Sequence, residues 1–286
     1  MSHRYTYLSI GFGTLLFVIW FFILQSLPHD SGKLKVAFLD IGQGDAIYIE
    51  APNGNQMIID GGPGIALMNK LPEVLPWGDK TIDTVVITNP DADHYSGLIP
   101  LFEQYAVASV VEPGTRSETS LYQTLEEHII LEHVPHLLAT RGMEIILDSE
   151  KHISYEILFP DRDVSTWETN DGSIVGKLTY GDTSFLLMGD ATILTEGIVV
   201  AENKNTLDTI DVLKLGHHGS RTSSGNPILT ATTPDVAIIS AGLNNKYGHP
   251  HQEVIDRLLA LHIPYLTTFK EGTIICESDS MDIICQ

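Results

Sequence analysis

The stretch Val85-Val86-Ile87-Thr88-Asn89-Pro90-Asp91-Ala92-Asp93-His94 carries the strongest indication of both the fold and its chemistry. Its first residues are apolar and β-branched, which favours a strand. The run then ends in two carboxylates and an imidazole within four residues. Two carboxylates this close repel one another unless a cation neutralises them. One interpretation is a metal site at the end of a strand, and the other is an Asp-rich turn that caps the next helix.

Two further predicted strands also end in side chains that bind metals. One precedes Asp190, and the other precedes the pair His217 and His218. Side chains just beyond the ends of neighbouring strands converge at one edge of a sheet. A carboxylate such as that of Asp190 is suited to bridging two metals. Three segments of the same kind favour the metal interpretation over the helix cap.

The rest of the chain alternates short strands with helices. Residues 34–60 contain three strand-like runs separated by Gly- and Asn-containing turns, which predicts an antiparallel meander. From residue 84 onward, strands alternate with helices predicted at 97–105, 120–132, 226–232 and 250–261. A meander joined to strand–helix units predicts an α/β sandwich, with two sheets inside and helices outside.

The composition limits the function classes. The 286 residues are 43% hydrophobic, enough for a large core, and the net charge is −21. An acidic surface repels phosphate backbones at long range, so it excludes nonspecific nucleic-acid binding through a broad basic face. It does not exclude a local site in which metal ions supply the positive charge.

The N-terminal segment predicts a membrane anchor. Residues 5–24 carry no charged side chain, and about 20 such residues span a bilayer as a helix. The apolar run exceeds the roughly 7–15 residues of a cleaved signal peptide, which favours an uncleaved signal anchor. Arg4 before it favours a cytoplasmic N-terminus. We therefore predict a single-pass protein of the cell membrane, with a cytoplasmic stub and anchor at 1–28, a linker at 29–34 and an extracytoplasmic domain at 35–286.

The two cysteines, Cys276 and Cys285, flank a predicted C-terminal hairpin. In an exported domain, a disulfide across this hairpin is one interpretation. Two buried thiols that behave as small apolar residues are the other. The sequence leaves these alternatives open.

Six motifs follow one another along the chain: Val36–Ala46, Thr88–Gly97, Asn170–Ser173, Gly189–Asp190, Gly216–Ser220 and Tyr247–His251. Together they resemble the metallo-β-lactamase-like domain of ComEC-type competence proteins, a family of DNA-uptake channels. The resemblance implies an αββα four-layer sandwich, here preceded by one N-terminal transmembrane helix. It also implies hydrolysis, most often of phosphodiesters, with one or two divalent ions at one edge of the sheets.

The resemblance implies a set of metal ligands: Asn89, Asp91, Asp93, His94, Asp190 and His217. Asn89 stands where the family has a histidine, so its position is oxygen-rich and suits manganese or magnesium. The position formed by the other ligands suits zinc or manganese. His217 is preferred to His218 because it comes first after the strand.

Further roles follow from the proposed hydrolysis and from the positions of the residues. Asp93 is expected to orient the attacking water or accept its proton, and His249 to bond the phosphate or the leaving oxygen. His218, Ser220 and Ser173 are expected to contact substrate, and Asp60 to support the site from behind the ligands. The alternatives are a helix-start histidine at His249 and simple turn or cap roles for the serines.

Three hypotheses remain. The first is a membrane-anchored, metal-dependent phosphodiesterase resembling a nuclease, with the bilayer, DNA and a separate DNA-uptake channel as partners. The second keeps the site but takes a small phosphodiester such as a phosphocholine ester, which the acidic surface favours. The third is a degenerate, non-catalytic binding domain, indicated by Asn89.

Overall fold

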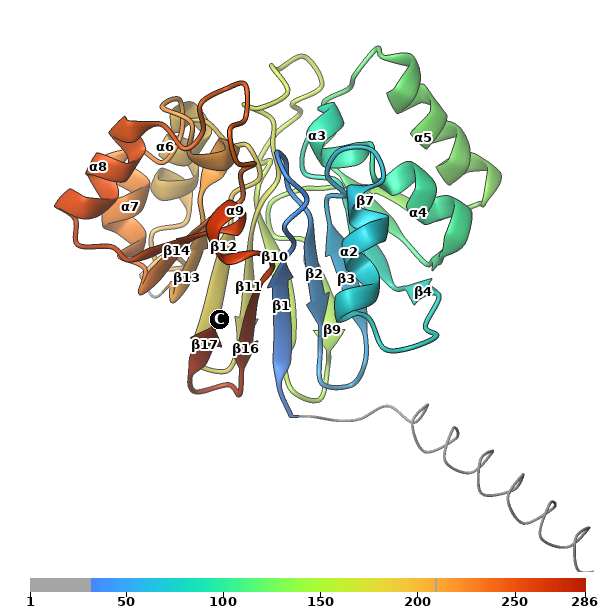
Figure 1. The fold of residues 1–286 in the computed structure, drawn as a ribbon, viewed down its shortest axis with the longest axis horizontal. Coiled ribbons are helices and arrows are strands. Elements are labelled where there is room, and N and C mark those ends of the chain that lie inside the picture. Colours follow the sequence, from blue (N-terminus) through green and yellow to red (C-terminus); the bar gives the residue numbers. More distant parts are fainter. Residues whose placement is uncertain (1–31, 209) are drawn as a thin grey trace, which may run out of the picture.

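The structure, a computed structural model, describes residues 32–208 and 210–286. Two β-sheets pack face to face in the centre, and helices cover their outer faces (Figure 1). The predicted anchor at 1–28 lies outside the described residues. Within the described ranges, no helix combines the length and apolar character needed to cross a bilayer.

The first sheet has eight strands in the order β17-β16-β1-β2-β3-β5-β7-β8. Their bounds are β1 (Leu34–Phe38), β2 (Ile47–Glu50), β3 (Gln56–Ile59), β5 (Thr84–Val86), β7 (Val110–Glu112), β8 (His136–Leu138), β16 (Ile274–Ser278) and β17 (Ile283–Cys285). Strands β1, β2 and β3 pair antiparallel, which confirms the predicted meander. From β3 through β5 and β7 to β8 the pairing is parallel.

The second sheet has seven strands in the order β15-β14-β13-β12-β11-β10-β9. Their bounds are β9 (Glu144–Asp148), β10 (Ile153–Phe159), β11 (Val175–Tyr180), β12 (Thr183–Leu187), β13 (Val212–Lys214), β14 (Val236–Ile239) and β15 (Tyr265–Thr267). Strands β9 to β12 pair antiparallel and β12 to β15 pair parallel. Strands β4 (Thr81–Ile82) and β6 (Ala106–Val107) form a separate parallel pair.

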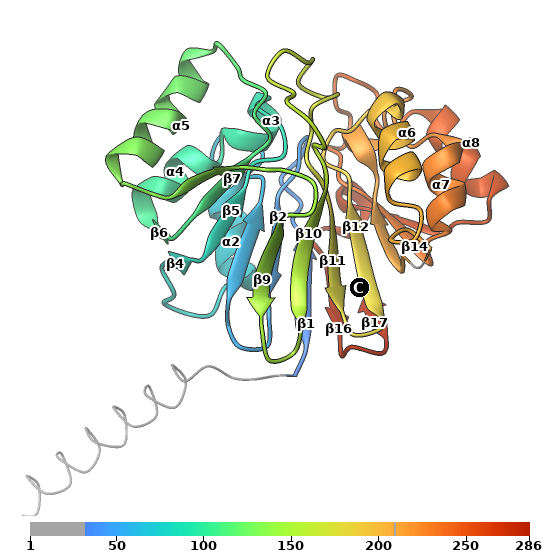
Figure 2. The same cartoon turned by 180° about the vertical axis from the view of Figure 1, so that it is seen from behind.

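The helices are divided between the two outer faces. The first sheet is covered by α2 (Ala66–Val74), α3 (Ala92–Tyr95), α4 (Leu98–Gln104) and α5 (Ser120–Leu131). The second is covered by α6 (Ile193–Glu202), α7 (Asn226–Thr232) and α8 (Gln252–Ala260), with the short α9 (Thr268–Glu271) beside them. Figures 1 and 2 show these two groups on opposite sides of the paired sheets.

Three apolar cores hold these four layers together. In β1, Val36 and Phe38 point into the core between the sheets, whereas Ala37 points into the core under α2 and α4. The third core lies between the second sheet and α6 to α8. Alternate residues of a strand face opposite sides, so a strand buried on both faces reads as a continuous apolar run. The predicted αββα sandwich is confirmed.

The two cysteines form a disulfide across the C-terminal hairpin. Cys276 and Cys285 are paired residues of β16 and β17, with Cα atoms 4.0 Å apart, and a disulfide joins them. Strands β6 and β7 follow one another closely along the chain but belong to different sheets. Ser109 lies between them, and its hydroxyl donates to Asp83 O at 3.0 Å.

Candidate metal centre

The ends of three strands meet at one edge of the sandwich. Helix α3, which follows β5, carries His94. Asp190 lies three residues after the end of β12, and His218 lies four residues after the end of β13. His94 Nε2 lies 3.1 Å from Asp190 Oδ2, and His218 Nε2 lies 3.5 Å from Asp190 Oδ1. His218 Nε2 is also 3.6 Å from Asp93 Oδ2. The structure therefore brings all three predicted segments together.

Close backbone packing holds the turn that carries Asp93. The N–H of Asp45 donates to Asp93 O at 3.2 Å. Gly44 has a φ of +127°, and a Cβ there would collide with the same carbonyl oxygen. Glycine alone adopts this conformation readily and leaves room for the approach. The loop between β1 and β2 thus fixes the position of Asp93.

The two histidines after β13 adopt an unusual backbone conformation. His217 has a φ of 47° and His218 a φ of 54°, both in the left-handed region that non-glycine residues rarely occupy. Such conformations cost free energy and occur mostly at functional sites. Here they direct two consecutive imidazoles into the space beside Asp190.

His94 lies between two carboxylates. Its Nδ1 is 2.8 Å from Asp60 Oδ2, opposite the contact to Asp190. Asp60 also accepts from the N–H of Thr88 at 2.7 Å and from its hydroxyl at 2.5 Å. Burial opposes protonation of His94, but Asp190 and Asp60 outweigh it and hold its pKa well above the usual value. Asp60 thus contacts His94 on the side of the ring away from Asp190, and such a contact fixes the orientation of an imidazole.

Several buried ligand atoms in this cluster lack a well-aligned hydrogen bond. They are His94 Nε2, Asp190 Oδ1 and both ring nitrogens of His218. Burial raises the pKa of Asp190, but the neighbouring imidazoles of His218 and His94 lower this pKa to well below its usual value. Burial lowers the pKa of His218, but the negative charges of Asp190 and Asp45 outweigh burial and raise it to about 9. The site therefore strongly favours positive charge.

The donor atoms fit a divalent cation. The ligand atoms of Asp93, His94 and His218 all lie within 4.8 Å of one another, as do those of Asp45, Asp190 and His218. Ligand atoms about 2.0–2.2 Å from a tetrahedral zinc ion lie about 3.3–3.6 Å apart. The contacts of 3.1, 3.5 and 3.6 Å between these side chains are close to that spacing.

The structure distinguishes the two neighbouring histidines. His218 is 1% exposed and belongs to two of the candidate ligand groups. His217 is 23% exposed, and its Nε2 is 3.8 Å from Asp190 Oδ2. Its Nδ1 lies 3.3 Å from Thr222 Oγ1. His218, for which we predicted a substrate contact, thus lies where we expected His217.

Both polar atoms of the Asn89 side chain form hydrogen bonds within the protein. Its Nδ2 donates to Asn170 Oδ1 at 2.7 Å and to Ser173 Oγ at 3.2 Å, and its Oδ1 accepts from the N–H of Asp91 at 2.9 Å. Asp91 Oδ2 accepts from Thr169 Oγ1 at 3.1 Å. Burial raises the pKa of Asp91. The loop that carries Asn170 therefore holds this corner by hydrogen bonds, and Ser173 is part of that network.

The other predicted residues lie around the rim. The side chain of Asp93 is 29% exposed; burial raises its pKa, but His218 and His94 lower it below the usual value. His249 packs edge-on against His217, with ring centroids 5.2 Å apart. Burial and the neighbouring imidazoles lower the pKa of His249 to about 4. Ser220 lies 3.0 Å from the hydroxyl of Thr222, within its own turn.

A buried ion pair behind His218 was not predicted from the sequence. Lys214 is fully buried, contacts Asp45 Oδ2 through its ammonium group and donates to Gly189 O at 3.2 Å. Asp45 Oδ1 lies 3.3 Å from His218 Nδ1. Two signals were present: Lys214 interrupts an apolar strand, and Asp45 lies within the first of the six motifs.

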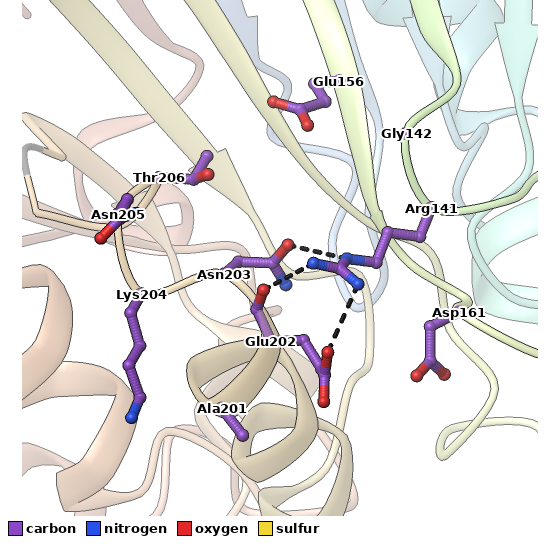
Figure 3. A pocket seen from close by; sticks show the side chains of 10 residues that line it. All are labelled: Arg141, Gly142, Glu156, Asp161, Ala201, Glu202, Asn203, Lys204, Asn205 and Thr206. Carbon is purple, nitrogen blue, oxygen red and sulfur yellow. Dashed lines mark hydrogen bonds and ion pairs between the residues drawn. The ribbon is translucent and has the colours of Figure 1, made fainter.

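A pocket of about 670 Å³ adjoins the cluster, and its wall includes Asp91, Asp93, Gln43, Lys246 and Tyr247. A second pocket of about 670 Å³ lies elsewhere, beside α6. Figure 3 shows its Arg141 turned toward Asn203 and Glu202, to which the guanidinium group donates. That second pocket shares no residue with the candidate ligand groups.

Comparison with known proteins identifies relatives of the whole described domain. Residues 39–242 match the family described as the Metallo-beta-lactamase superfamily. ComE operon protein 3 of Bacillus subtilis (strain 168) is 30% identical over 275 residues, which are 88% of this chain and 34% of that protein. Recombination protein 2 of Haemophilus influenzae is 29% identical over 262 residues, 90% of this chain and 30% of that protein. Competence protein ComA of Neisseria gonorrhoeae is 28% identical, covering 87% of this chain and 33% of that protein.

These relatives are ComEC-type competence proteins, which confirms the resemblance. The chain spans about a third of the length of the curated relatives it matches.

Solved structures show the same fold. The metallo-beta-lactamase fold protein YhfI from Bacillus subtilis has a TM-score of 0.52 at 11% identity, over 82% of this chain and 95% of that one. Tm1679, a metal-dependent hydrolase of the beta-lactamase superfamily, has a TM-score of 0.50 at 8% identity, with the same coverage. A mutant of CmlA beta-hydroxylase has a TM-score of 0.53 at 14% identity, over 82% of this chain and 52% of that one. Because a hydroxylase is among them, the fold alone does not determine the reaction. The chain belongs to the metallo-β-lactamase superfamily.

Proposed function

We propose that this member of the metallo-β-lactamase superfamily is a metal-dependent hydrolase that cleaves phosphodiester bonds, as a nuclease does. One observation carries the proposal: buried ring nitrogens of His94 and His218 face the carboxylate of Asp190 at 3.1 and 3.5 Å without well-aligned hydrogen bonds. Buried polar atoms in folded proteins are almost always bonded, so their convergence indicates that a cation completes the site. We assign its ligands as Asp93, His94, Asp190 and His218.

The chemistry of the donors indicates the metal. Two imidazoles and two carboxylates form a mixed nitrogen and oxygen set, which suits zinc or manganese. A divalent ion bound there would polarise the phosphoryl oxygen and lower the pKa of a water molecule. We also propose a second ion beside Asp91, a residue of the pocket wall. The metal stoichiometry of the purified protein tests this.

The residues of the chain divide the remaining work. Asp93, partly exposed on the pocket wall, accepts the proton of the attacking water. Asp60, hydrogen-bonded to His94 Nδ1, keeps that ring in orientation, and the carboxylate of Asp45, 3.3 Å from His218 Nδ1, positions the other ring by its charge. His249, beside His217, bonds the phosphate or the leaving oxygen.

Phosphodiesters are favoured as substrates by the names of the relatives, which are competence and recombination proteins. A second candidate is a small phosphodiester such as a phosphocholine ester. The net charge of −21 favours it, because a small substrate needs no basic groove. We also propose that residues 1–28 anchor the chain in the cell membrane, with the domain outside the cytoplasm and a separate channel as partner. Protease accessibility in intact cells tests this orientation.

The full-length chain in detergent provides the test of activity. Bound metal is measured, followed by turnover of single-stranded DNA and of bis-p-nitrophenyl phosphate with added zinc or manganese. Asp190→Ala removes a proposed ligand, and Asp235→Ala, at an exposed site, is the matched control. We expect Asp190→Ala alone to lose metal and activity. Absence of both metal and turnover in the wild type would refute the proposal, and ester turnover that survives Asp190→Ala would refute the ligand assignment.

A further inference from the structure

We propose that the loop at residues 242–249 forms a nucleobase-binding subsite and that the substrate is a single-stranded nucleic acid. Tyr247 stacks on the base, and Lys246 pairs with a phosphate next to the one that is cleaved. This inference rests on the proposed function, since the subsite opens beside the metal ligands. It specifies that the protein recognises a base and a neighbouring phosphate of the substrate.

The loop is built around one side chain. Asn245 donates from Nδ2 to Gly242 O at 2.9 Å and to His249 O at 2.6 Å. Its Oδ1 accepts from the N–H groups of Tyr247 at 3.1 Å and His249 at 3.0 Å. The amide thus bonds to both halves of the loop. Such a loop holds its two outward side chains in place before any ligand arrives, which reduces the cost of binding.

Tyr247 presents an aromatic surface at the pocket wall. Its side chain is 51% exposed, and its ring lies nearly parallel to that of His249, at an interplanar angle of 21° and a centroid distance of 5.6 Å. An exposed tyrosine backed by another ring offers a flat surface on which any base can stack. Because Asp93 lines the same pocket, a base stacked on Tyr247 lies next to the proposed proton acceptor.

Lys246 and Gln43 supply the polar contacts. Lys246 is exposed, and its ammonium group lies over the Tyr247 ring, 4.8 Å from the centroid, so it leaves the ring face when it pairs with a phosphate and a base stacks there. It is the one cationic side chain among the described residues that line this pocket, whose wall also carries Asp91 and Asp93. Gln43 Oε1 accepts from Gly242 N at 3.4 Å, whereas its Nε2 is buried and has no partner within the described part of the chain. The pocket therefore combines a cation with an aromatic face.

This combination fits a nucleotide better than a choline headgroup. A quaternary ammonium group also binds aromatic faces, but Lys246 beside the ring would repel it. The face of a base is free to stack only in a single strand. The net charge of −21 likewise favours contacts limited to one or two nucleotides over the long phosphate contacts of a duplex.

The test compares two oligomers of equal length and equal phosphate number, oligo-thymidine DNA and the same chain with abasic sites. Binding is measured with full-length protein in chelator, where no cleavage occurs, and kcat/KM is measured with manganese. The wild type should bind and cleave the thymidine oligomer about tenfold better than the abasic one, from the usual strength of base stacking on an aromatic ring. Tyr247→Leu should abolish this preference, and Tyr247→Phe should keep it. Tyr265→Leu, a partly exposed tyrosine on β15, is the matched control and should also keep it. Lys246→Gln should weaken binding of both oligomers equally.

The outcomes separate the two proposals. Turnover with no preference for bases, or a Tyr247→Leu variant that keeps the preference, would overturn the subsite and leave the hydrolase intact. A base preference in binding without any turnover would overturn the hydrolase and support the subsite. If Tyr247→Leu impaired turnover of glycerophosphocholine but not of the oligomers, the pocket would belong to a choline headgroup and the subsite would be overturned.

Discussion

The site has two polar corners, one around Asn89 and one around Asp190, and they differ in whether their polar groups are hydrogen-bonded within the protein. Around Asn89, each polar group that faces the 169–173 loop has a hydrogen-bond partner within the protein. Around Asp190, the imidazoles of His94 and His218 meet a carboxylate without such bonds. A buried group that is bonded stabilises the fold by itself, whereas a buried group that is not bonded costs free energy until a ligand satisfies it. The contrast distinguishes residues that hold the site together from residues that we propose as metal ligands.

The largest expected effect is at the unsatisfied corner. Asp190→Asn removes the charge that faces both histidines, and we expect metal binding to be lost and kcat/KM to fall about 1,000-fold, or about 4 kcal/mol. Metal analysis and ester turnover measure this, with Asp235→Asn as the exposed control. Retention of metal by Asp190→Asn would contradict the comparison.

The next effect concerns a carboxylate that is buried but bonded. Glu196 accepts from the N–H of Ser224 and, at 2.8 Å, from that of Gly225. Burial, opposed in part by these bonds, raises the pKa of Glu196 to about 7. The pKa of Glu196 in the folded state exceeds the usual value of 4.5, so the folded protein binds this proton more tightly than the unfolded chain does. The stabilisation by the bound proton is therefore complete below about pH 4.5 and is lost as the pH rises through about 7.

A shift of this size corresponds to at most about 3 kcal/mol. We expect the free energy of unfolding to fall between pH 5 and pH 8 less steeply in Glu196→Gln than in the wild type. Denaturant titrations at several pH values, with Glu202→Gln as an exposed control, measure the difference. Equal slopes would exclude Glu196 as the titrating group.

A smaller effect is expected behind the metal ligands. Asp45→Asn keeps the shape but removes the charge that faces His218 and Lys214. Loss of a partner that orients a ligand histidine typically costs about 10–100-fold in metal affinity or activity. Titration with manganese should show weaker binding, and saturating metal should restore part of the turnover. Metal affinity equal to that of the wild type would exclude the positioning role of Asp45.

The smallest effect on catalysis is expected at the satisfied corner. Asn89→Ala leaves Asn170, Ser173 and the N–H of Asp91 without their partner. We expect a loss of about 1–3 kcal/mol in the free energy of unfolding, the cost of unsatisfied buried groups, with kcat/KM changed less than in Asp45→Asn. Thermal unfolding and ester turnover provide the two readouts. A larger loss of bound metal in Asn89→Ala than in Asp190→Asn would reverse the assignment of the two corners.

Much of the fold was predictable from local patterns. The meander, α5 and α7 appear close to their predicted bounds because apolar periodicity and turn residues mark them. Strands β8, β9 and β15 were not predicted. All three lie at sheet edges, and the three residues of β8 are exposed, so no alternation of apolar and polar residues marks that strand.

The sequence by itself determined the superfamily, the αββα order of layers and three of the four proposed ligands, Asp93, His94 and Asp190. Each lies in a short segment whose residue types reveal both a strand end and its chemistry. Only the tertiary structure decided between His217 and His218, because it buries His218 between Asp93 and Asp190 and leaves His217 23% exposed. It alone paired Asp45 with Lys214, 169 residues away in sequence, and bonded Asn89 to Asn170. Which side chains are satisfied depends on neighbours that are distant along the chain, and only folding brings them together.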